Sequence, residues 1–489
     1  MMSRQTGSIG HGPGASDHGP RATGHGFSDV DFAGITPELL ARYDRPGPRY
    51  TSYPTAPQFH PGFAAGDYGA ALESASRRAG EPLSLYVHVP FCEARCTYCG
   101  CNIVISPRHG PELAYLDALE GELALVADRL GERRTLGQLH WGGGTPTYLT
   151  PAQCERLFGA ITSRFHLAAG AEVAIEVDPC VTTDDHLRVL RALGFNRISL
   201  GVQDFDERVQ QAVHRVQSLE LTRHLVEHAR ALGFGSVNID LIYGLPYQTP
   251  EQFSGSVSLV IRELAPDRVA AFSYAHVPWI KPHQRALEGL PLPKGYEKFR
   301  IFAAAAERFQ AAGYRFIGMD HFARPGDELS QALDAGYLHR NFMGYTVLPA
   351  TDMIGVGVTS IGDVGGCYVQ NEKNLARYRR SIDEGILPVE RGLARSAEDE
   401  LRGAVIRRLI CTFQLDFDWV RQRLGVDPEA RFATELEALR PFVDDGLLEI
   451  DVRGIRVLPR GRFFIRNICM PFDAYLSRDA GKQVYSRTV

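Results

Sequence analysis

One short loop with four cysteines constrains this chain more than any other feature of its sequence. Cys92, Cys96 and Cys99 follow a C-x3-C-x2-C spacing, and Cys101 comes two residues later. Three thiolates on one loop can hold three irons of a 4Fe-4S cluster, which leaves the fourth iron open to a small chelating ligand. Zinc is the alternative, but such zinc sites add a second, distant pair of ligands that the sequence lacks. We therefore expect a reactive iron–sulfur site, with the rest of the chain as its scaffold.

Beyond residue 82, strand and helix patterns alternate with a period of very roughly 35 residues, the length of a βα unit. The cysteine loop follows the first strand, and Gly142, Gly143 and Gly144 follow the second. Six such units predict an α/β fold, a partial and open parallel (β/α)6 barrel, in which sites lie at the C-terminal ends of the strands. The predicted strands are residues 83–89, 138–141, 173–177, 197–202, 237–243 and 268–274.

Composition and pattern divide the chain into four expected regions. They are a disordered tail (1–30), an N-terminal helical segment (31–80), the barrel with its loops (81–366) and a C-terminal domain (367–489). The last part of the barrel region, 314–366, is expected to be loop-rich. From Ser396, three amphipathic helices and a two-strand pattern predict a winged-helix-like module. Its acidic and basic residues balance, which favours a substrate lid over DNA binding.

The overall charge and the cysteine content exclude some classes of protein. The 489 residues carry a net charge of −5 with both signs interspersed, which argues against a nucleic-acid binder. No stretch has the length of a membrane span. Nine cysteines, four of them on one loop, fit a reducing compartment better than a disulfide framework. We expect a cytoplasmic protein that binds neither nucleic acid nor a membrane.

Several motifs resemble one known family. The cysteine spacing, with Tyr98 before the third cysteine, looks like the signature of the radical S-adenosylmethionine (SAM) superfamily. The context Tyr86-Val-His-Val-Pro-Phe-Cys92 resembles the oxygen-independent coproporphyrinogen III oxidase (coproporphyrinogen dehydrogenase) family. Further motifs match that family from about residue 48 to residue 470, at 48–55, 140–147, 201–205, 318–325 and 466–470.

The resemblance implies a reaction and its cofactors. Members oxidatively decarboxylate two propionates of coproporphyrinogen III to vinyl groups and give protoporphyrinogen IX, as a step of haem biosynthesis. A 5′-deoxyadenosyl radical from SAM takes a hydrogen from the propionate β-carbon. The implied partners and cofactors are the 4Fe-4S cluster, SAM with two molecules in each active site, and an electron donor such as flavodoxin or ferredoxin. A monomer is expected.

Polar residues at strand ends are candidates for SAM binding. The glycines let backbone approach a ligand, although a tight turn alone would also explain them. Glu176 and Asp240 are carboxylates within apolar strands, where they contact either a ligand or a structural ion-pair partner. The resemblance extends the set of SAM contacts to Tyr86, Tyr98, Gly143, Gly144, Thr145, Glu176, Gln203, Arg215, Asp240, Ala275 and Ile361.

Two residues are candidates for catalysis. Tyr86 alone would be a core tyrosine, but the matching family residue lies between cluster, SAM and substrate. Cys101 has no role in a cluster already held by Cys92, Cys96 and Cys99, and by spacing alone it could equally be a packing residue. The resemblance, in which this cysteine is needed for turnover, favours a catalytic role.

The substrate carboxylates need cationic partners. Arg49, Arg340 and Arg466 lie in family-like segments and are our candidates, with structural salt bridges as the alternative. Met343 departs from the family, which often has glutamine there. Because methionine cannot donate an amide hydrogen bond, the polar part of a second SAM site is in doubt.

Two alternative functions fit the sequence less well. A haem-trafficking paralogue with the same cluster but no decarboxylase activity typically has an aromatic residue at Cys101 and lacks the 49–53 stretch, so both features favour the oxidase. A regulatory winged-helix protein with a sensor cluster would need a basic C-terminal domain, which this chain lacks.

Overall fold

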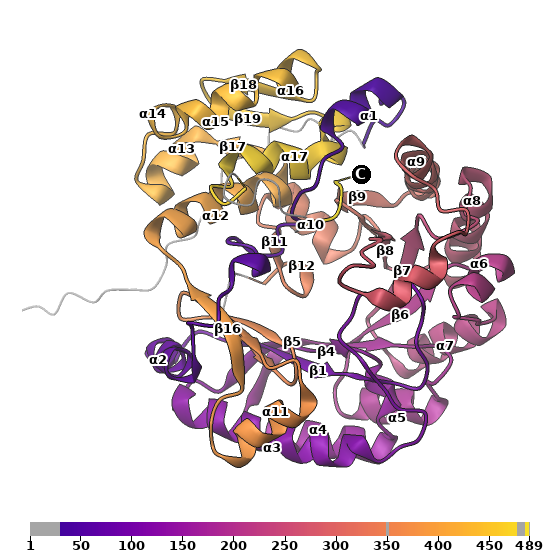
Figure 1. Ribbon diagram of the computed structural model, residues 1–489, viewed down its shortest axis with the longest axis vertical. Helices are drawn as coiled ribbons and strands as arrows, with labels where there is room; N and C mark the ends of the chain where they lie inside the picture. Colours follow the sequence, from indigo (N-terminus) through magenta and orange to yellow (C-terminus); the bar gives the residue numbers. More distant parts are fainter. Residues whose placement is uncertain (1–29, 349–351, 477–484, 489) are drawn as a thin grey trace, which may run out of the picture.

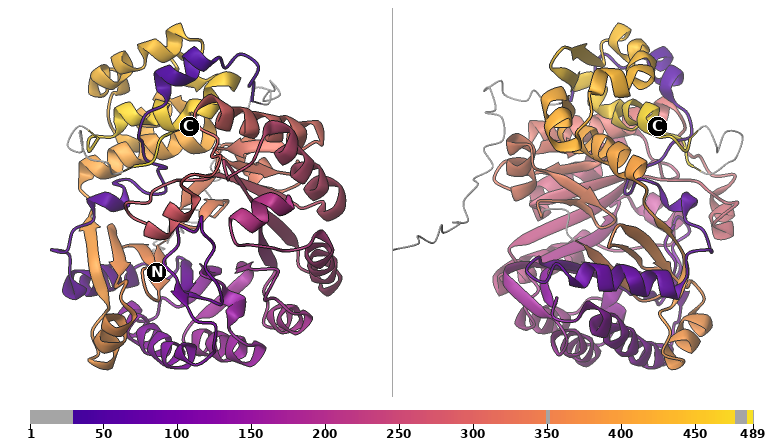
Figure 2. Two further views of the ribbon diagram at one scale, coloured as in Figure 1. Left: turned by 45° about the vertical axis from the view of Figure 1, so that its right-hand side comes forward. Right: turned by 90° about the vertical axis from the view of Figure 1, so that its left-hand side faces the viewer.

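The computed structural model describes residues 30–348, 352–476 and 485–488, so the expected disordered tail lies almost wholly outside the described residues. A large curved sheet has helices on its outer face, and a smaller lobe built mainly from C-terminal residues lies beside it (Figures 1 and 2). The sheet has 12 strands in the order β16-β15-β14-β13-β1-β4-β5-β6-β7-β8-β10-β9.

The six predicted βα units are confirmed and form the centre of this sheet. Their parallel strands lie side by side in chain order: β1 (Leu83–Val89), β4 (Thr135–Gly143), β5 (His166–Val177), β6 (Arg197–Gln203), β7 (Ser236–Tyr243) and β8 (Arg268–Ser273). Thr150 and Thr249 cap two of the connecting helices, each accepting a hydrogen bond from the backbone three residues later. The helices are α3 (Pro111–Leu130), α4 (Pro151–Thr162), α5 (Asp184–Ala192), α6 (Glu207–Ala212), α7 (Leu219–Leu232), α8 (Pro250–Leu259) and α9 (Tyr296–Ala311).

Side chains alternate along each strand between the helix-covered face and the lumen of the barrel. In β1, Leu85 and Val87 are fully buried in the core, whereas Tyr86 and His88 line a cavity on the opposite face. The lumen is polar near the strand N-terminal ends. There Gln138 Nε2 donates to Glu172 Oε1 (2.8 Å), and Arg197 Nε pairs with Glu172 Oε2 (3.0 Å). Such charged groups tolerate enclosure because each has a partner.

The prediction of a loop-rich segment at residues 314–366 is wrong. This segment adds strands to the main sheet, and β13 pairs in parallel with β1. Strands of three or four residues are too short to show the alternation that marks longer ones. The segment contains β9 (Arg315–Gly318), β10 (His321–Ala323), α10 (Glu328–Ala335), β11 (His339–Asn341), β12 (Gly344–Thr346), β13 (Met353–Val356) and β14 (Ile361–Val364).

The main sheet also runs through the boundary expected at residue 366. β15 (Cys367–Asn371) pairs with β14 and β16 (Val389–Ala394), and α11 (Leu375–Asp383) packs beside α3. We therefore propose that a division into domains lies nearer Ser396, which caps the next helix. Two more short strands, β2 (Phe91–Cys92) and β3 (Val104–Ile105), pair with each other at the cysteine loop.

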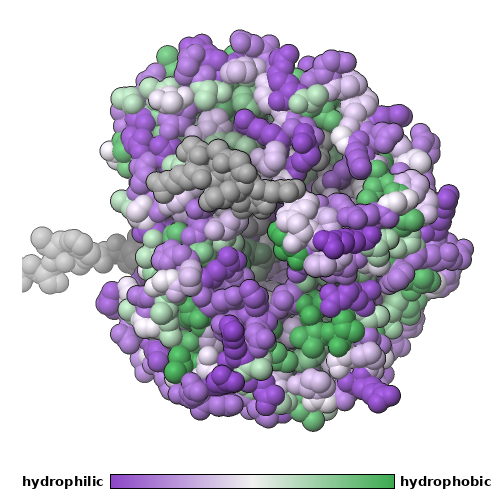
Figure 3. All heavy atoms as spheres, in the orientation of Figure 1, coloured by the Kyte–Doolittle hydropathy of each residue, from purple (hydrophilic) through white to green (hydrophobic). Residues whose placement is uncertain are grey.

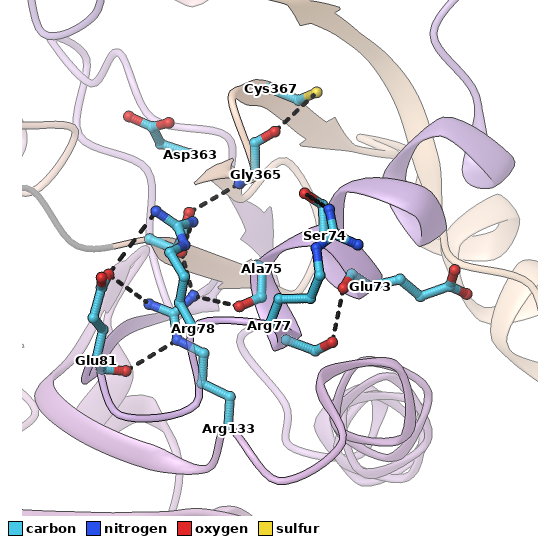
Figure 4. Close-up of polar contacts among 12 residues, drawn as sticks. Glu73, Ser74, Ala75, Arg77, Arg78, Glu81, Arg133, Asp363, Gly365 and Cys367 are labelled. Atoms are coloured by element: carbon cyan, nitrogen blue, oxygen red, sulfur yellow. Dashed lines mark hydrogen bonds and ion pairs between the residues drawn. The ribbon is translucent and has the colours of Figure 1, made fainter. Parts of the chain in front are cut away.

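The N-terminal helical segment contacts both lobes of the molecule. Its first helix, α1 (Pro37–Tyr43), lies against the C-terminal lobe, where the Tyr43 hydroxyl donates to Asp445 Oδ2 (2.6 Å). Its second helix, α2 (Ala65–Ser76), is fixed to the barrel by a buried arginine. Arg133 donates to the Ala75 carbonyl (3.0 Å) and to the Glu81 carbonyl (3.0 Å), and it pairs with Asp352 (Figure 4). Residues 44–64 therefore cross from one lobe to the other.

The C-terminal lobe begins with one long helix, α12 (Ala397–Thr412), rather than three. Short helices follow because Gly425, Pro428 and Pro441 interrupt the helical pattern. The predicted two-strand pattern is confirmed as the hairpin of β18 (Leu448–Asp451) and β19 (Gly454–Val457), with β17 (Gln414–Asp416) added to its edge. The short helices are α13 (Phe417–Trp419), α14 (Pro428–Arg431), α15 (Ala433–Ala438), α16 (Arg440–Asp444) and α17 (Ile465–Cys469). Within the described residues, no helix has both the length and the apolar character that a membrane crossing needs.

Candidate active site

The cysteine loop leaves β1 at the C-terminal edge of the sheet. Residues that follow β4 and α6 hold the loop: the Thr145 hydroxyl lies 3.4 Å from the Cys92 sulfur, and Arg215 Nη1 lies 3.8 Å from the Cys96 sulfur. The Thr97 amide also donates to the Val213 carbonyl (3.1 Å). The loop is therefore fixed in front of the lumen rather than free in solvent.

The three thiols suit a multi-iron cluster. Within the part of the chain that the structure describes, no three His, Cys, Asp or Glu side chains converge closely enough to bind a single metal ion. Loss of hydration raises the pKa of Cys92 to about 11 and also raises that of Cys96. Positive charge from bound iron would offset that cost. The donor set thus fits a cluster held by Cys92, Cys96 and Cys99, and this assignment stays a prediction.

The glycine turn at the end of β4 packs backbone directly against the cysteine loop. The Gly143 amide, at a φ of +115°, donates to Glu176 Oε2 (3.2 Å). A Cβ atom on Gly144 would lie 2.7 Å from the carbonyl carbon of Pro90, the residue before the loop. No side chain fits there without moving the loop.

Replacing Gly144 with alanine should therefore displace the base of the cysteine loop. We expect a loss of roughly 1–3 kcal/mol of stability, as in overpacked cores, together with a lower iron content. Thermal unfolding and iron analysis of anaerobically purified protein measure both effects. Gly255→Ala is the matched control, because a Cβ there meets nothing within 4 Å. Equal melting temperature and iron content in both variants would refute this reading.

Four side chains form a polar layer above the middle of the lumen. The Tyr86 hydroxyl lies 3.1 Å from His88 Nδ1, and its ring stacks on His140 at 5.9 Å between centroids. His140 Nε2 lies 3.1 Å from Glu176 Oε1. The two histidines were missed as candidates, although strand alternation from Tyr86 and Gly142 would have placed both on the inward face.

The contacts fix the protonation of this layer. His88 Nε2 faces the Asn102 carbonyl at 3.1 Å, so it carries the proton and donates. Burial lowers the pKa of His88 and keeps the ring neutral, so its Nδ1 accepts from the Tyr86 hydroxyl. Burial lowers the pKa of His140, but the hydrogen bond to Glu176 and the charges of the nearby carboxylates together raise it above its ordinary value. The side chain of Glu176 is 44 % exposed. Burial raises its pKa, but the hydrogen bond and charge of His140 and the hydrogen bond from the Gly143 amide together lower that pKa below its ordinary value.

Asp240 is the second carboxylate of the lumen. It accepts hydrogen bonds from the Ser199 hydroxyl (3.1 Å) and from Asn238 Nδ2 (2.8 Å). Desolvation, and then the charge of Glu176, raises the pKa of Asp240 to about 7. The interpretation as a plain ion pair is not supported, because its described partners are neutral.

The raised pKa makes the protein's stability depend on pH. The native state binds this proton more tightly than the unfolded chain, so the stabilisation is complete below about pH 4 and is lost as the pH rises through about 7. Asp240→Asn should therefore gain melting temperature over the parent protein at pH 8 but not at pH 5. The exposed Asp451→Asn is the control. A difference that does not change with pH would contradict the expectation.

Gln203 and Arg215 approach the cluster side of the lumen. Gln203 has a φ of +68°, and its Oε1 atom is buried without a hydrogen-bond partner in the described residues. Such an orphaned acceptor fits a ligand donor, for example a SAM hydroxyl or ammonium group. Arg215 pairs with Asp178 Oδ2 (2.8 Å) and donates to the Gly201 carbonyl (2.6 Å), so it positions the loop as well as any ligand.

The remaining SAM candidates are spread around the same edge. Ala275 follows β8, and Ile361 lines a cavity of about 210 Å³. Tyr98 instead packs into a small apolar cluster, and its carbonyl accepts from Gln284 Nε2 (2.9 Å). The residues lining the cavity are Tyr86, His88, Phe342, Met343, Thr359, Ser360 and Ile361. The space-filling view shows the molecule hollowed near its middle (Figure 3).

The three arginines proposed for the substrate carboxylates have different environments. Arg49 forms an ion pair with Asp320. Arg466 donates to the Pro48 carbonyl (2.9 Å) and to the Gly47 carbonyl (2.5 Å), and burial lowers its pKa to about 9. Arg340 alone keeps two buried nitrogens, Nε and Nη1, without a partner among the described residues.

Cys101 is exposed, whereas the three proposed cluster ligands are partly buried. Its carbonyl accepts from Lys281 Nζ (2.9 Å), which holds the end of the loop against residues 281–284. The Cys101 thiol itself contacts the Cys99 thiol, and this hydrogen bond together with burial raises the pKa of Cys101.

This open parallel barrel with a three-cysteine loop at its C-terminal edge defines the radical SAM class. A family profile described as the radical SAM superfamily matches residues 86–260, and one described as the HemN C-terminal domain matches residues 396–464. Both matches agree with the two parts seen in the structure.

Curated relatives extend the similarity to nearly the whole chain. The oxygen-independent coproporphyrinogen III oxidases of Salmonella typhimurium and Escherichia coli are 47 % and 46 % identical, each over 92 % of this chain and 98 % of the relative. The solved E. coli enzyme, described as a radical SAM enzyme, superimposes with a TM-score of 0.85 at 45 % identity, over 92 % of this chain and 100 % of that one. The chain belongs to the family of oxygen-independent coproporphyrinogen III oxidases. It is an oxidoreductase of porphyrin biosynthesis, and its class implies a 4Fe-4S cluster and SAM.

Proposed function

We propose that the chain converts two propionates of coproporphyrinogen III to vinyl groups and so forms protoporphyrinogen IX. The observation that carries the proposal is the meeting of the cysteine loop with the glycine turn over a polar lumen, in a chain similar to coproporphyrinogen III oxidases along nearly its whole length. When bound, the cluster and SAM supply the 5′-deoxyadenosyl radical that takes hydrogen from a substrate carbon.

The residues of the chain hold and orient these groups. Cys92, Cys96 and Cys99 would hold the cluster. The Gly143 backbone and the Glu176 carboxylate would form hydrogen bonds with the amino acid part of SAM. The Gln203 and Asp240 oxygens would accept hydrogen bonds from the ammonium or hydroxyl groups of SAM. Other SAM contacts proposed from the resemblance are Tyr98, Gly144, Thr145, Arg215, Ala275 and Ile361.

Tyr86 and Cys101 are the proposed catalytic residues. The Tyr86 hydroxyl is oriented by His88, which is fixed in turn by the carbonyl of Asn102, the residue after Cys101. This chain of hydrogen bonds links the tyrosine to the end of the cysteine loop. A substrate arm that enters the 210 Å³ cavity would contact Tyr86 directly.

A second SAM beside the first is also proposed, with Met343 offering it apolar contact in place of an amide. We further propose a cytoplasmic monomer that receives electrons from a flavodoxin or ferredoxin and binds neither nucleic acid nor a membrane.

Anaerobic incubation with coproporphyrinogen III, SAM and a reductant tests the proposal. We expect protoporphyrinogen IX, 5′-deoxyadenosine, and close to four irons for each chain. SAM cleavage without vinyl product would favour the trafficking paralogue, and zinc without iron would exclude the radical mechanism.

A further inference from the structure

A second, smaller cavity of about 60 Å³ lies beside the lumen, where three segments distant in the sequence meet. They are residues 50–53, the hairpin of β11 and β12, and the face of α12 that carries Gly403, Ile406 and Arg407. Phe342 lines both this cavity and the 210 Å³ cavity beside Tyr86, so the two adjoin. We name the smaller one the arginine pocket.

The arginine pocket contains buried hydrogen-bond donors that have nothing to bind. Nε and Nη1 of Arg340 have no partner among the described residues, and neither has the hydroxyl of Ser52, a residue 8 % exposed. The Arg340 guanidinium is held by stacking, with its carbon 4.7 Å from the Tyr345 ring centre. Unpaired buried donors are costly, and a guanidinium more so than a hydroxyl. A fixed guanidinium with unpaired donors beside a free hydroxyl is suited to an anionic ligand with acceptor oxygens.

The charge of the arginine pocket points to an anion. Arg407 also lines it and forms no ion pair or hydrogen bond with any described residue. The acid of the pocket, Asp363, is paired with Arg395 at 2.5 Å and interacts with Arg407 only through its charge. Arg340 and Arg407 thus bring two positive charges that form no ion pair with any described side chain.

We propose that the arginine pocket binds the carboxylate of one substrate propionate, an arm other than the one being oxidised. This inference rests on the proposed function. The carboxylate accepts from an unpaired donor of Arg340 and from the Ser52 hydroxyl, while Arg407 adds charge. The pocket has room for a side arm and not for a macrocycle, and its neighbour beside Tyr86 is open to the reacting arm. Arg49 and Arg466, already bound to Asp320 and to backbone carbonyls, do not take this role.

Arg340→Gln tests the proposal in the cluster-containing protein. Loss of a charged hydrogen-bond donor should raise the KM for coproporphyrinogen III by roughly tenfold or more, with kcat and substrate-free SAM cleavage close to normal. The KM of Arg340→Lys should lie between that of the parent protein and that of Arg340→Gln, and Ser52→Ala should raise KM a few-fold. The control is Arg453→Gln on the 86 % exposed side chain of the β18–β19 turn.

Unchanged KM in Arg340→Gln would overturn the proposal, as would an equal rise in the control. If Arg340→Gln fails to fold by circular dichroism, Ser52→Ala and Arg407→Gln decide in the same assay. If the parent protein cleaves SAM but forms no vinyl product, the proposed function fails. Equilibrium binding of coproporphyrin III then still decides on the pocket: weaker binding in Arg340→Gln supports it, and equal binding refutes it.

Discussion

Replacing Cys92, Cys96 or Cys99 with serine, one at a time, should abolish both the iron–sulfur cluster and reductive cleavage of SAM. A hydroxyl at physiological pH is not a thiolate, and each of the three corners is assigned a single protein ligand, so each variant leaves one iron without its thiolate. The fold itself should survive, because the loop lies outside the apolar core of the barrel and the three thiols are only partly buried.

Iron content, the visible absorption of the cluster and 5′-deoxyadenosine release measure the effect on anaerobic samples. Cys367→Ser is the matched control, since that sulfur lies on β15, outside the cysteine loop, and donates to the Gly365 carbonyl at 3.9 Å. We expect the control to keep its iron. A full cluster in two of the three loop variants would mean that the ligands are misassigned.

Cys101→Ala should separate SAM cleavage from product formation. The three-thiolate motif is intact in this variant, so iron content and deoxyadenosine release should survive, whereas vinyl formation should fall by orders of magnitude. A packing role predicts a different outcome, a loss on the order of one kcal/mol of stability with near-normal turnover.

The decisive measurement is a pair, deoxyadenosine and protoporphyrinogen IX from the same sample. Cys180→Ala, at an exposed cysteine outside the loop, controls for the loss of a surface thiol. Near-normal product from Cys101→Ala would remove the residue from the catalytic machinery. Loss of the cluster itself would instead place Cys101 among the ligands.

The central strands and the positions of the glycine turn and the carboxylates could be predicted from sequence because their signals are local. Six strands of six to twelve residues show apolar runs or alternation, and caps such as Thr150 mark the helices between them. Sites in such barrels gather at the strand C-terminal ends, so Gly143, Glu176 and Gln203 could be assigned to one edge before any geometry was known.

Other features could not be predicted because they depend on pairing between distant segments. The strands of residues 314–366 are too short to carry a pattern and exist because β1 and β8 offer them open edges. Strand alternation places His140 on the inward face, but its contact with Glu176 on the next strand is a feature of the folded chain alone.

The sequence by itself determined the cysteine spacing, the repeating βα units and, through its motifs, the resemblance to the family, since these features are local in the chain. Only the tertiary structure decided which of the candidate arginine side chains already have a partner within the protein. Three arginines looked equivalent as charges in family-like segments, but Arg49 meets Asp320, Arg466 meets backbone carbonyls, and Arg340 meets neither. Whether a buried charge has a partner depends on every segment that packs around it. Residues 50–53, 339–346 and 403–410 come together only in the folded chain.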